Sequence, residues 1–203
     1  MLEPQDGLLT FRAEGNNIPG SPWYSRKIHW PGNMAKCNSH GSGVTIGRGY
    51  DLGKRTRNEV MRTLIMAGIT QLQAEKIAEG VKLTHCQAGE FVRKNKDKIG
   101  EITEMQQLKL FQIIYPDYVD RTARFYNTYK KAGAIPWGKM NTFLKEVLID
   151  MNFQGIFRKK SVPVAEKNDP LQLIMHIKNE PYLLQHEENR KRIPHLMKGM
   201  ENA

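Results

Sequence analysis

The stretch that decides the fold reads Gly43-Val44-Thr45-Ile46-Gly47-Arg48-Gly49-Tyr50-Asp51-Leu52-Gly53. Apolar and other side chains alternate over residues 44–50, which is typical of a strand with one buried face. The preceding Gly-Ser-Gly at residues 41–43 favours a turn, so we expect a hairpin or a small sheet here. Residues 15–53 contain eight glycines and three prolines, a density that excludes a long helix.

Helical signals flank this region on both sides. A short helix is expected over residues 4–14, with Pro4 in its first turn. Glu14 would be its last side chain, and Gly15 follows as a natural helix stop. The helix therefore leads directly into the glycine-rich region, and a carboxyl group closes it.

The chain after Thr56 is predicted to be helical throughout. Thr-x-x-Gln capping boxes begin at Thr70 and Thr103. A long helix starts at the second box, and Pro116 is expected to kink or divide it before residues 118–129. A last helix is expected near residues 187–197, interrupted by Pro194. The predicted fold class is α+β, predominantly α-helical, with a small glycine-rich sheet near the N-terminus.

Length and composition fit one soluble domain. The chain has 203 residues, a mean hydropathy of −0.58 and 39% hydrophobic residues, which excludes a disordered tail protein. No apolar run approaches the length of a membrane span, so no membrane insertion is expected. The first residues lack the basic and apolar regions of a signal peptide.

The net charge, the cysteines and the histidines bear on partners, disulfides and metal sites. The formal net charge is +10, which favours an anionic partner such as nucleic acid, a membrane surface or a cell-wall polymer. Cys37 and Cys86 are too few for a disulfide framework or a cysteine-built zinc site. Two reduced thiols are the first expectation, and a single bridge is the alternative in an oxidising compartment. The six histidines form no close ligand pair, so neither a metal nor another cofactor is expected.

Two carboxylates and one hydroxyl are the candidates for chemistry. At the end of a helix, Glu14 would feel the negative end of the dipole, which favours the protonated form that a general acid needs. Asp51 follows the strand and can stay ionised to activate water. Thr45, six residues earlier, lies between glycines and can hold that water. Two carboxyls with divided roles commonly cut glycosidic bonds, although a solvated Glu and a turn-forming Asp are the simpler interpretation of the pair alone.

These residues also carry a resemblance. Glu14-Gly15 and residues 43–53 resemble the active-site signature of the lysozyme-like domain of pesticin-type bacteriocins, which is related to domains of type VI secretion effectors. The Thr-Ile-Gly-x-Gly core is also similar to that of phage-type lysozymes. Looser matches follow in the same order, at residues 102–111, at 148–155 and at Asn189-Arg190, so that the resemblance covers about residues 8–192.

The resemblance implies a two-lobed lysozyme-like fold that forms a single catalytic domain over residues 1–203. The small lobe would comprise about residues 15–100, the interlobe helix about 103–130, and the C-terminal lobe about 131–203 together with helix 4–14. The long stretch between Glu14 and Thr45 contains aromatic side chains that would stack on sugars or cover the small lobe; these are Trp23, Tyr24, His29 and Trp30.

The implied activity is that of a muramidase, which cleaves the β-1,4 bond between N-acetylmuramic acid and N-acetylglucosamine in peptidoglycan. Glu14 would be the acid, Asp51 the base or cation stabiliser, and Thr45 the residue that places the water. Gln154, Arg190 and Tyr50 would lie on the substrate side, with Arg190 also paired to Glu14. Phage-type enzymes carry their acidic residue six positions before the threonine. Ser39 stands at that position here, so Asp51 takes the role, as in the pesticin pattern.

The expected setting follows from the same resemblance. The protein would be a monomeric bacteriolytic toxin or lysin, secreted or injected, that acts on glycan strands in the periplasm or cell wall of a target bacterium, with an immunity protein as a further partner. A non-catalytic cell-wall-binding module with the same fold is the alternative. Nucleic-acid binding has only the charge in its favour and is not expected.

Overall fold

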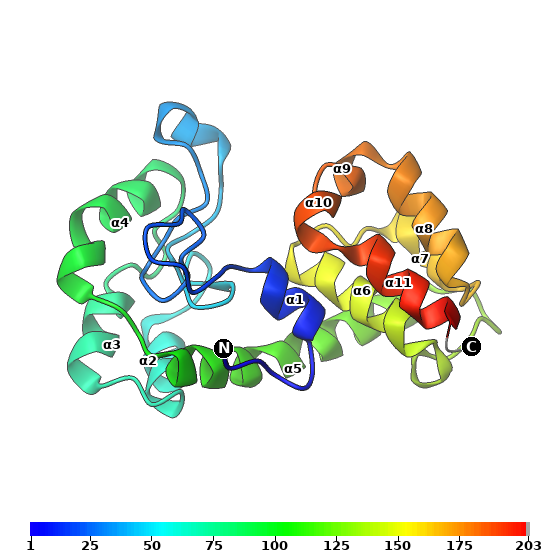
Figure 1. The fold of residues 1–203 in the computed structure, drawn as a ribbon, viewed down its shortest axis with the longest axis horizontal. Helices are drawn as coiled ribbons and strands as arrows, with labels where there is room; N and C mark the ends of the chain where they lie inside the picture. Colours follow the sequence, from blue (N-terminus) through cyan, green and yellow to red (C-terminus); the bar gives the residue numbers. More distant parts are fainter. Residues whose placement is uncertain (202–203) are drawn as a thin grey trace. The chain divides into compact units, whose positions relative to one another are not determined.

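Most of the chain is helical, and the computed structural model describes residues 1–201 (Figure 1). The α-helices are α1 (Leu8–Ala13), α2 (Arg57–Met66), α3 (Gln71–Ala78), α4 (His85–Ile99), α5 (Glu104–Tyr129), α6 (Thr142–Phe153), α7 (Val162–Ala165), α8 (Pro170–Asn179), α9 (Pro181–Leu184), α10 (Glu187–Arg190) and α11 (Arg192–Glu201). Strands β1 (Thr45–Ile46) and β2 (Tyr50–Asp51) form a two-stranded antiparallel sheet. The predicted fold class, a predominantly helical α+β protein, is confirmed.

The chain divides into two compact units. The first unit contains residues 1–6 and 14–114, and the second contains residues 7–13 and 115–203. Helix α5 begins in the first unit and ends in the second. Glu14, Thr45 and Asp51 all belong to the first unit, whereas Gln154 and Arg190 belong to the second.

The hairpin of the first unit follows the predicted alternation. Its apolar side chains lie in the core and are completely buried; they are Val44, Ile46, Tyr50 and Leu52. Thr45 and Asp51 occupy the positions between them and pair directly across the two strands, so their side chains lie on the opposite face. Gly47 and Gly49 form the turn with φ of +65° and +83°, values at which a Cβ is unfavourable. The two turn glycines therefore permit the tight turn that brings Asp51 opposite Thr45.

Capping side chains determine where several helices begin. At the start of α5, Gln106 N donates to Thr103 Oγ1 at 3.1 Å and Thr103 N donates to the Gln106 side chain at 2.8 Å, which is the predicted capping box. Thr70 accepts from Gln73 N at 3.3 Å at the start of α3. Pro116 was expected to kink or divide this helix, and it lies inside α5 without dividing it. Ile114 and Tyr115, which directly precede this proline, are buried. The free energy of their burial offsets the cost of the hydrogen bond that proline removes.

The two terminal helices differ from their predicted bounds. Helix α1 begins at Leu8 rather than residue 4, because Gly7 has a φ of +76° and a left-handed residue interrupts a right-handed helix. The last predicted helix is interrupted at Lys191, which has a φ of +56° and separates α10 from α11. The predicted interruption at Pro194 is therefore wrong, since this proline lies in the first turn of α11, where proline is tolerated.

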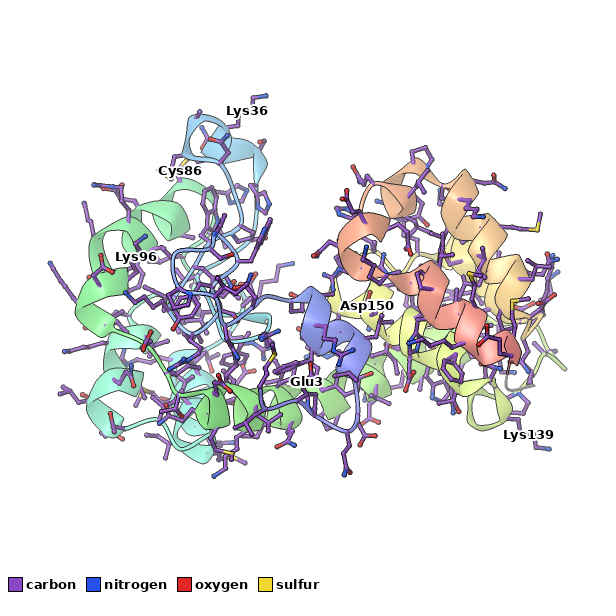
Figure 2. All side chains as sticks on the ribbon, viewed as in Figure 1. Glu3, Lys36, Cys86, Lys96, Lys139 and Asp150 are labelled. Atoms are coloured by element: carbon purple, nitrogen blue, oxygen red, sulfur yellow. A yellow bond between two sulfur atoms is a disulfide. The ribbon has the colours of Figure 1, made fainter. Side chains whose placement is uncertain are left out.

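Cys37 and Cys86 form a disulfide, with their Cα atoms 4.8 Å apart. This corrects the first expectation of two reduced thiols and agrees with the alternative of a bridge. The bond joins the 3₁₀ helix η1 (Met34–Ser39) to the start of α4, and Figure 2 shows Cys86 beside the loop that carries Lys36. Closing a loop of 49 residues stabilises a fold by roughly 2–4 kcal/mol.

The second unit is an all-helical cluster. Helices α6, α8 and α11 pack against one another (Figure 1), and apolar side chains from each fill their common core, among them Leu148, Leu173 and Leu196. Leu9 of α1 packs against the same core. Among residues 1–201, no helix combines the length and the apolar character required to span a membrane.

Candidate functional site

The carboxylate of Asp51 is held by backbone N–H groups. Gly43 N lies 3.2 Å from Oδ1 and 3.1 Å from Oδ2, and Gly53 N donates to Oδ1 at 2.7 Å. These three contacts, made by two N–H groups to both carboxylate oxygens, fix the rotation of the group about the Cβ–Cγ bond. The Asp51 side chain is half-buried, so this fixed group still reaches the surface.

The glycines at 43 and 53 permit this close approach. A Cβ atom on Gly43 would lie 2.4 Å from Asp51 Oδ1 and 2.4 Å from Gly53 N, and one on Gly53 would lie 3.0 Å from Asp51 Oδ1. These distances are shorter than side-chain atoms allow. The two glycines of the motif are therefore required by the position of the carboxylate and not only by a turn.

We expect Gly43→Ala to reduce any activity that depends on Asp51 while the protein still folds. The added methyl group would push the carboxylate away from its donors. Gly41→Ala is the matched control in the same loop, since its nearest neighbour would be His85 Cε1 at an ordinary 3.5 Å. Both variants are compared by activity and by thermal unfolding. We call the backbone N–H groups of Gly43 and Gly53 the cradle of Asp51. Equal activity of the two variants would show that this cradle has no functional role.

Thr45 lies directly opposite Asp51 and is almost completely buried, with 7% of its surface exposed. Its hydroxyl donates to the carbonyl oxygen of Gly43 at 3.2 Å. Because a hydroxyl has one hydrogen and two lone pairs, Oγ1 keeps the capacity to accept a hydrogen bond. Thr45 can therefore hold a water molecule by accepting one of its hydrogens.

Glu14 is half-buried and lies in the turn that follows α1. A ladder of backbone hydrogen bonds connects its segment to the hairpin: Ser25 N donates to Asn16 O at 3.0 Å, and Gly47 N donates to Ser25 O at 2.8 Å. The ladder thus leads from Asn16, two residues after Glu14, to the turn that follows β1. The first unit therefore contains all three predicted catalytic residues on one connected framework.

Arg48, for which no role was predicted, reinforces that framework. Its guanidinium is 2% exposed and donates to the carbonyl oxygen of Gly15 at 2.7 Å and to Asn17 Oδ1 at 3.4 Å. Burial lowers the pKa of Arg48 to about 10, against the opposing charges of Glu3, Glu104 and Glu14. The side chain is therefore cationic at neutral pH. It ties the hairpin turn to the segment that begins at Glu14 and contributes a fixed positive charge there.

Tyr50 is completely buried, and the guanidinium of Arg55 covers its ring at 4.5 Å from the centroid. A ring in the core cannot contact a substrate. The prediction of Tyr50 as a substrate-binding residue is corrected on this ground, and Tyr50 instead supports the strand that carries Asp51.

Gln154 and Arg190 belong to a buried network in the second unit. Asp150, labelled in Figure 2, accepts from Thr10 Oγ1 at 2.9 Å, from Arg190 Nη1 at 3.0 Å and from Arg192 Nε at 2.7 Å. Arg192 Nη2 also donates to Gln154 Oε1 at 2.6 Å. Removing the carboxylate from such a network leaves buried charges without a partner, which is strongly destabilising. Asp150, the centre of this network, was not predicted, although an acidic side chain in an apolar helix was a signal.

The aromatic residues between Glu14 and Thr45 separate into two groups. Tyr24 is buried and donates to Glu101 at 2.5 Å, and Trp30 is half-buried and donates from Nε1 to Ser42 O at 2.9 Å. Trp23 is 61% exposed. Of these three residues, Trp23 alone is mostly exposed to solvent. The prediction that an aromatic side chain of this segment stacks on a sugar therefore fits Trp23 best. Within residues 1–201, no three His, Cys, Asp or Glu side chains are placed to hold a metal ion.

Comparison with known protein families identifies the family of this chain. The model of the family described as Domain of unknown function (DUF8812) matches residues 7–192, so the chain belongs to that family. A comparison with curated proteins finds no match.

Proposed function

We propose that this member of the DUF8812 family is a peptidoglycan hydrolase of the lysozyme type, an N-acetylmuramidase. The observation that carries the proposal is the fixed carboxylate of Asp51 opposite Thr45, on the same framework as Glu14. A half-buried carboxylate with three backbone hydrogen bonds and an adjacent hydroxyl acceptor suits the activation of a water molecule. The resemblance of residues 14–15 and 43–53 to lysozyme-like domains supplies the substrate class.

The proposed reaction moves two protons. Glu14 gives its proton to the glycosidic oxygen, and the bond between that oxygen and C1 of N-acetylmuramic acid breaks. Water, held by Thr45, attacks C1 and transfers a proton to Asp51. The result is one new reducing end and one free hydroxyl, and proton exchange with solvent restores both carboxyl groups. Water entering from the opposite face would invert the anomeric centre.

The remaining assignments follow the burial of each side chain. Arg190 is 7% exposed and bonded to Asp150, so we assign it to holding the second unit together rather than to sugar contact. Its pairing with Glu14 stays a prediction. Gln154 is half-buried, and its amide nitrogen is proposed to contact the glycan. Trp23, and not Tyr50, is proposed to contact the glycan.

The disulfide supports the proposed setting. Such bonds persist in secreted and periplasmic proteins and are rare in a reducing cytosol. The Cys37–Cys86 bond is therefore in keeping with a secreted or injected toxin or lysin that works in the periplasm or wall of a target bacterium. An immunity protein that blocks Asp51 would be a fitting partner.

The test is the chemistry of the new chain ends. Purified peptidoglycan is incubated with the protein, reduced with borohydride, and its fragments are identified by mass spectrometry. A muramidase yields reduced N-acetylmuramic acid at the new ends. Reduced N-acetylglucosamine would indicate a different bond, and binding to sacculi without any new ends would indicate the alternative, a non-catalytic wall-binding module.

The net charge of +10 leads to a separate expectation. Stem peptides carry carboxylates, so hydrolysis of whole sacculi should fall as salt rises from tens to hundreds of millimolar, because salt screens long-range attraction. Hydrolysis of a short neutral oligosaccharide should change much less. The double variant Lys96→Glu and Lys98→Glu, at two exposed residues of α4, should mimic added salt. The double variant Lys96→Arg and Lys98→Arg, which keeps both charges, is the control. Equal salt sensitivity on both substrates would contradict wall attraction by charge.

A further inference from the structure

His29 lies in the same cross-strand row as Thr45 and Asp51. Its backbone forms a bridge with Thr45, with His29 N donating to Thr45 O at 2.8 Å and Thr45 N donating to His29 O at 2.9 Å. Thr45 in turn pairs with Asp51. Directly opposed residues of antiparallel strands point to the same face, with Cβ atoms about 4.5–5.5 Å apart. The imidazole, the hydroxyl and the carboxylate therefore share one face of the sheet.

A hydrogen bond orients the imidazole ring. His29 Nδ1 lies 3.0 Å from the carbonyl oxygen of Lys27. A carbonyl oxygen can only accept, so in the neutral ring the hydrogen is on Nδ1 and Nε2 carries the lone pair. The half-buried side chain thus presents an acceptor on the face that it shares with Asp51.

Burial has a larger effect on the protonation of His29 than the groups around it. Burial lowers the pKa of His29 below its ordinary value of 6.5, while the Lys27 carbonyl and the charge of Asp51 oppose this shift. Asp51 is the charged group that faces it from β2, and Thr45 on β1 is neutral. The ammonium group of Lys27, on the same segment, bonds to Asp97 at 3.0 Å. His29 is therefore mostly neutral at pH 7.

We infer that His29 is a positioning residue of the Asp51 site, neutral when the site works, whose protonation in acid stops hydrolysis. This inference rests on the proposed function. One hydrogen of the attacking water is shared between Thr45 Oγ1 and the neutral Nε2, and Asp51 accepts the other, so that the oxygen lone pair faces C1. A protonated imidazole has no lone pair for the water. It also places a positive charge beside Asp51, which weakens Asp51 as a base.

The pairing of His29 with Asp51 is tested without any activity. The protein is labelled with ¹⁵N-histidine, and the pKa of His29 is measured by NMR titration in the wild type and in Asp51→Asn. Loss of the carboxylate charge should lower the His29 pKa further, because that charge stabilises the imidazolium. An unchanged pKa would overturn the inference and leave the proposed function standing.

The role in hydrolysis is tested by the pH profile. One pH unit below the His29 pKa, about nine-tenths of the molecules carry the imidazolium, so the wild type should keep about a tenth of its activity there. His29→Gln accepts a hydrogen bond but cannot be protonated, so its activity should persist to lower pH. His85→Asn, at an exposed histidine with a φ of +54°, is the control, since Asn tolerates that backbone.

The outcomes separate the two proposals. An acidic limb that does not move in His29→Gln, in a protein with normal thermal unfolding, would overturn the role of His29 alone. A wild type that releases no reducing ends at any pH would overturn the proposed function and the role of His29 in it. A purely structural histidine would change stability and leave the shape of the pH profile as it is.

Discussion

Glu14→Gln is expected to remove nearly all hydrolysis of peptidoglycan and to leave the fold intact. The amide has almost the shape of the carboxyl group but has no acidic proton to give to the leaving oxygen. General acid catalysis typically contributes 10²–10⁴-fold, so the rate of release of reducing ends should fall by about that factor. The measurement is that rate on purified peptidoglycan, with circular dichroism and thermal unfolding as checks on the fold.

A matched change elsewhere controls for the loss of one negative charge. Glu79→Gln alters an exposed glutamate at the end of α3 and should keep full activity. If Glu14→Gln retained a substantial part of the wild-type rate with normal unfolding, Glu14 would not be the acid. The search would then turn to the other carboxyl groups of the first unit.

Asp51→Asn should be similarly severe, with a loss of about 10²–10⁴-fold for removal of the general base. The structure makes this variant informative, because Asn Oδ1 can still accept from Gly43 N and Gly53 N. The side chain should therefore keep its position through Oδ1, losing its basicity and the contact between Gly43 N and Oδ2. Thr45→Ala should be weaker but clear, and Thr45→Ser, which keeps the hydroxyl, should retain most of the activity.

Azide separates a lost base from a lost fold. The azide ion attacks without having to lose a proton, so it needs no general base, while Glu14 still protonates the leaving oxygen. Asp51→Asn in azide should therefore form a glycosyl azide, detectable by mass spectrometry, and Glu14→Gln should form none. A folded Asp51→Asn that hydrolyses at the wild-type rate would remove Asp51 from the mechanism.

Local rules predicted the hairpin and several helix starts. Alternation over residues 44–50 indicated which side chains face the core, and Thr103 with Gln106 formed the expected box. These features depend on residues close in sequence. The break at Lys191 was not predictable in this way, because a lysine at positive φ carries no local signal.

The chemistry of the site was predictable only in part. The motif pointed to Asp51 and Thr45, but the donors that hold the carboxylate are backbone N–H groups, which every residue other than proline has. Arg48 and His29 act through contacts with residues 33 positions and 16 positions away. Their side-chain types alone did not reveal these contacts. Tyr50 shows the converse, since a motif residue next to a candidate catalytic residue can belong wholly to the core.

The Cys37–Cys86 bond lies close in sequence to a donor of the Asp51 carboxylate, and such bonds persist only where thiols are oxidised. Cys37 precedes Gly43 by six residues on the same loop, and Gly43 supplies a donor to both carboxylate oxygens. In surroundings that keep thiols reduced, that loop loses its covalent tether to α4, and the donor is held only by the hydrogen bonds around it. For the proposed hydrolase we therefore expect the oxidised form to be more active than the reduced form, which an assay with and without dithiothreitol would measure.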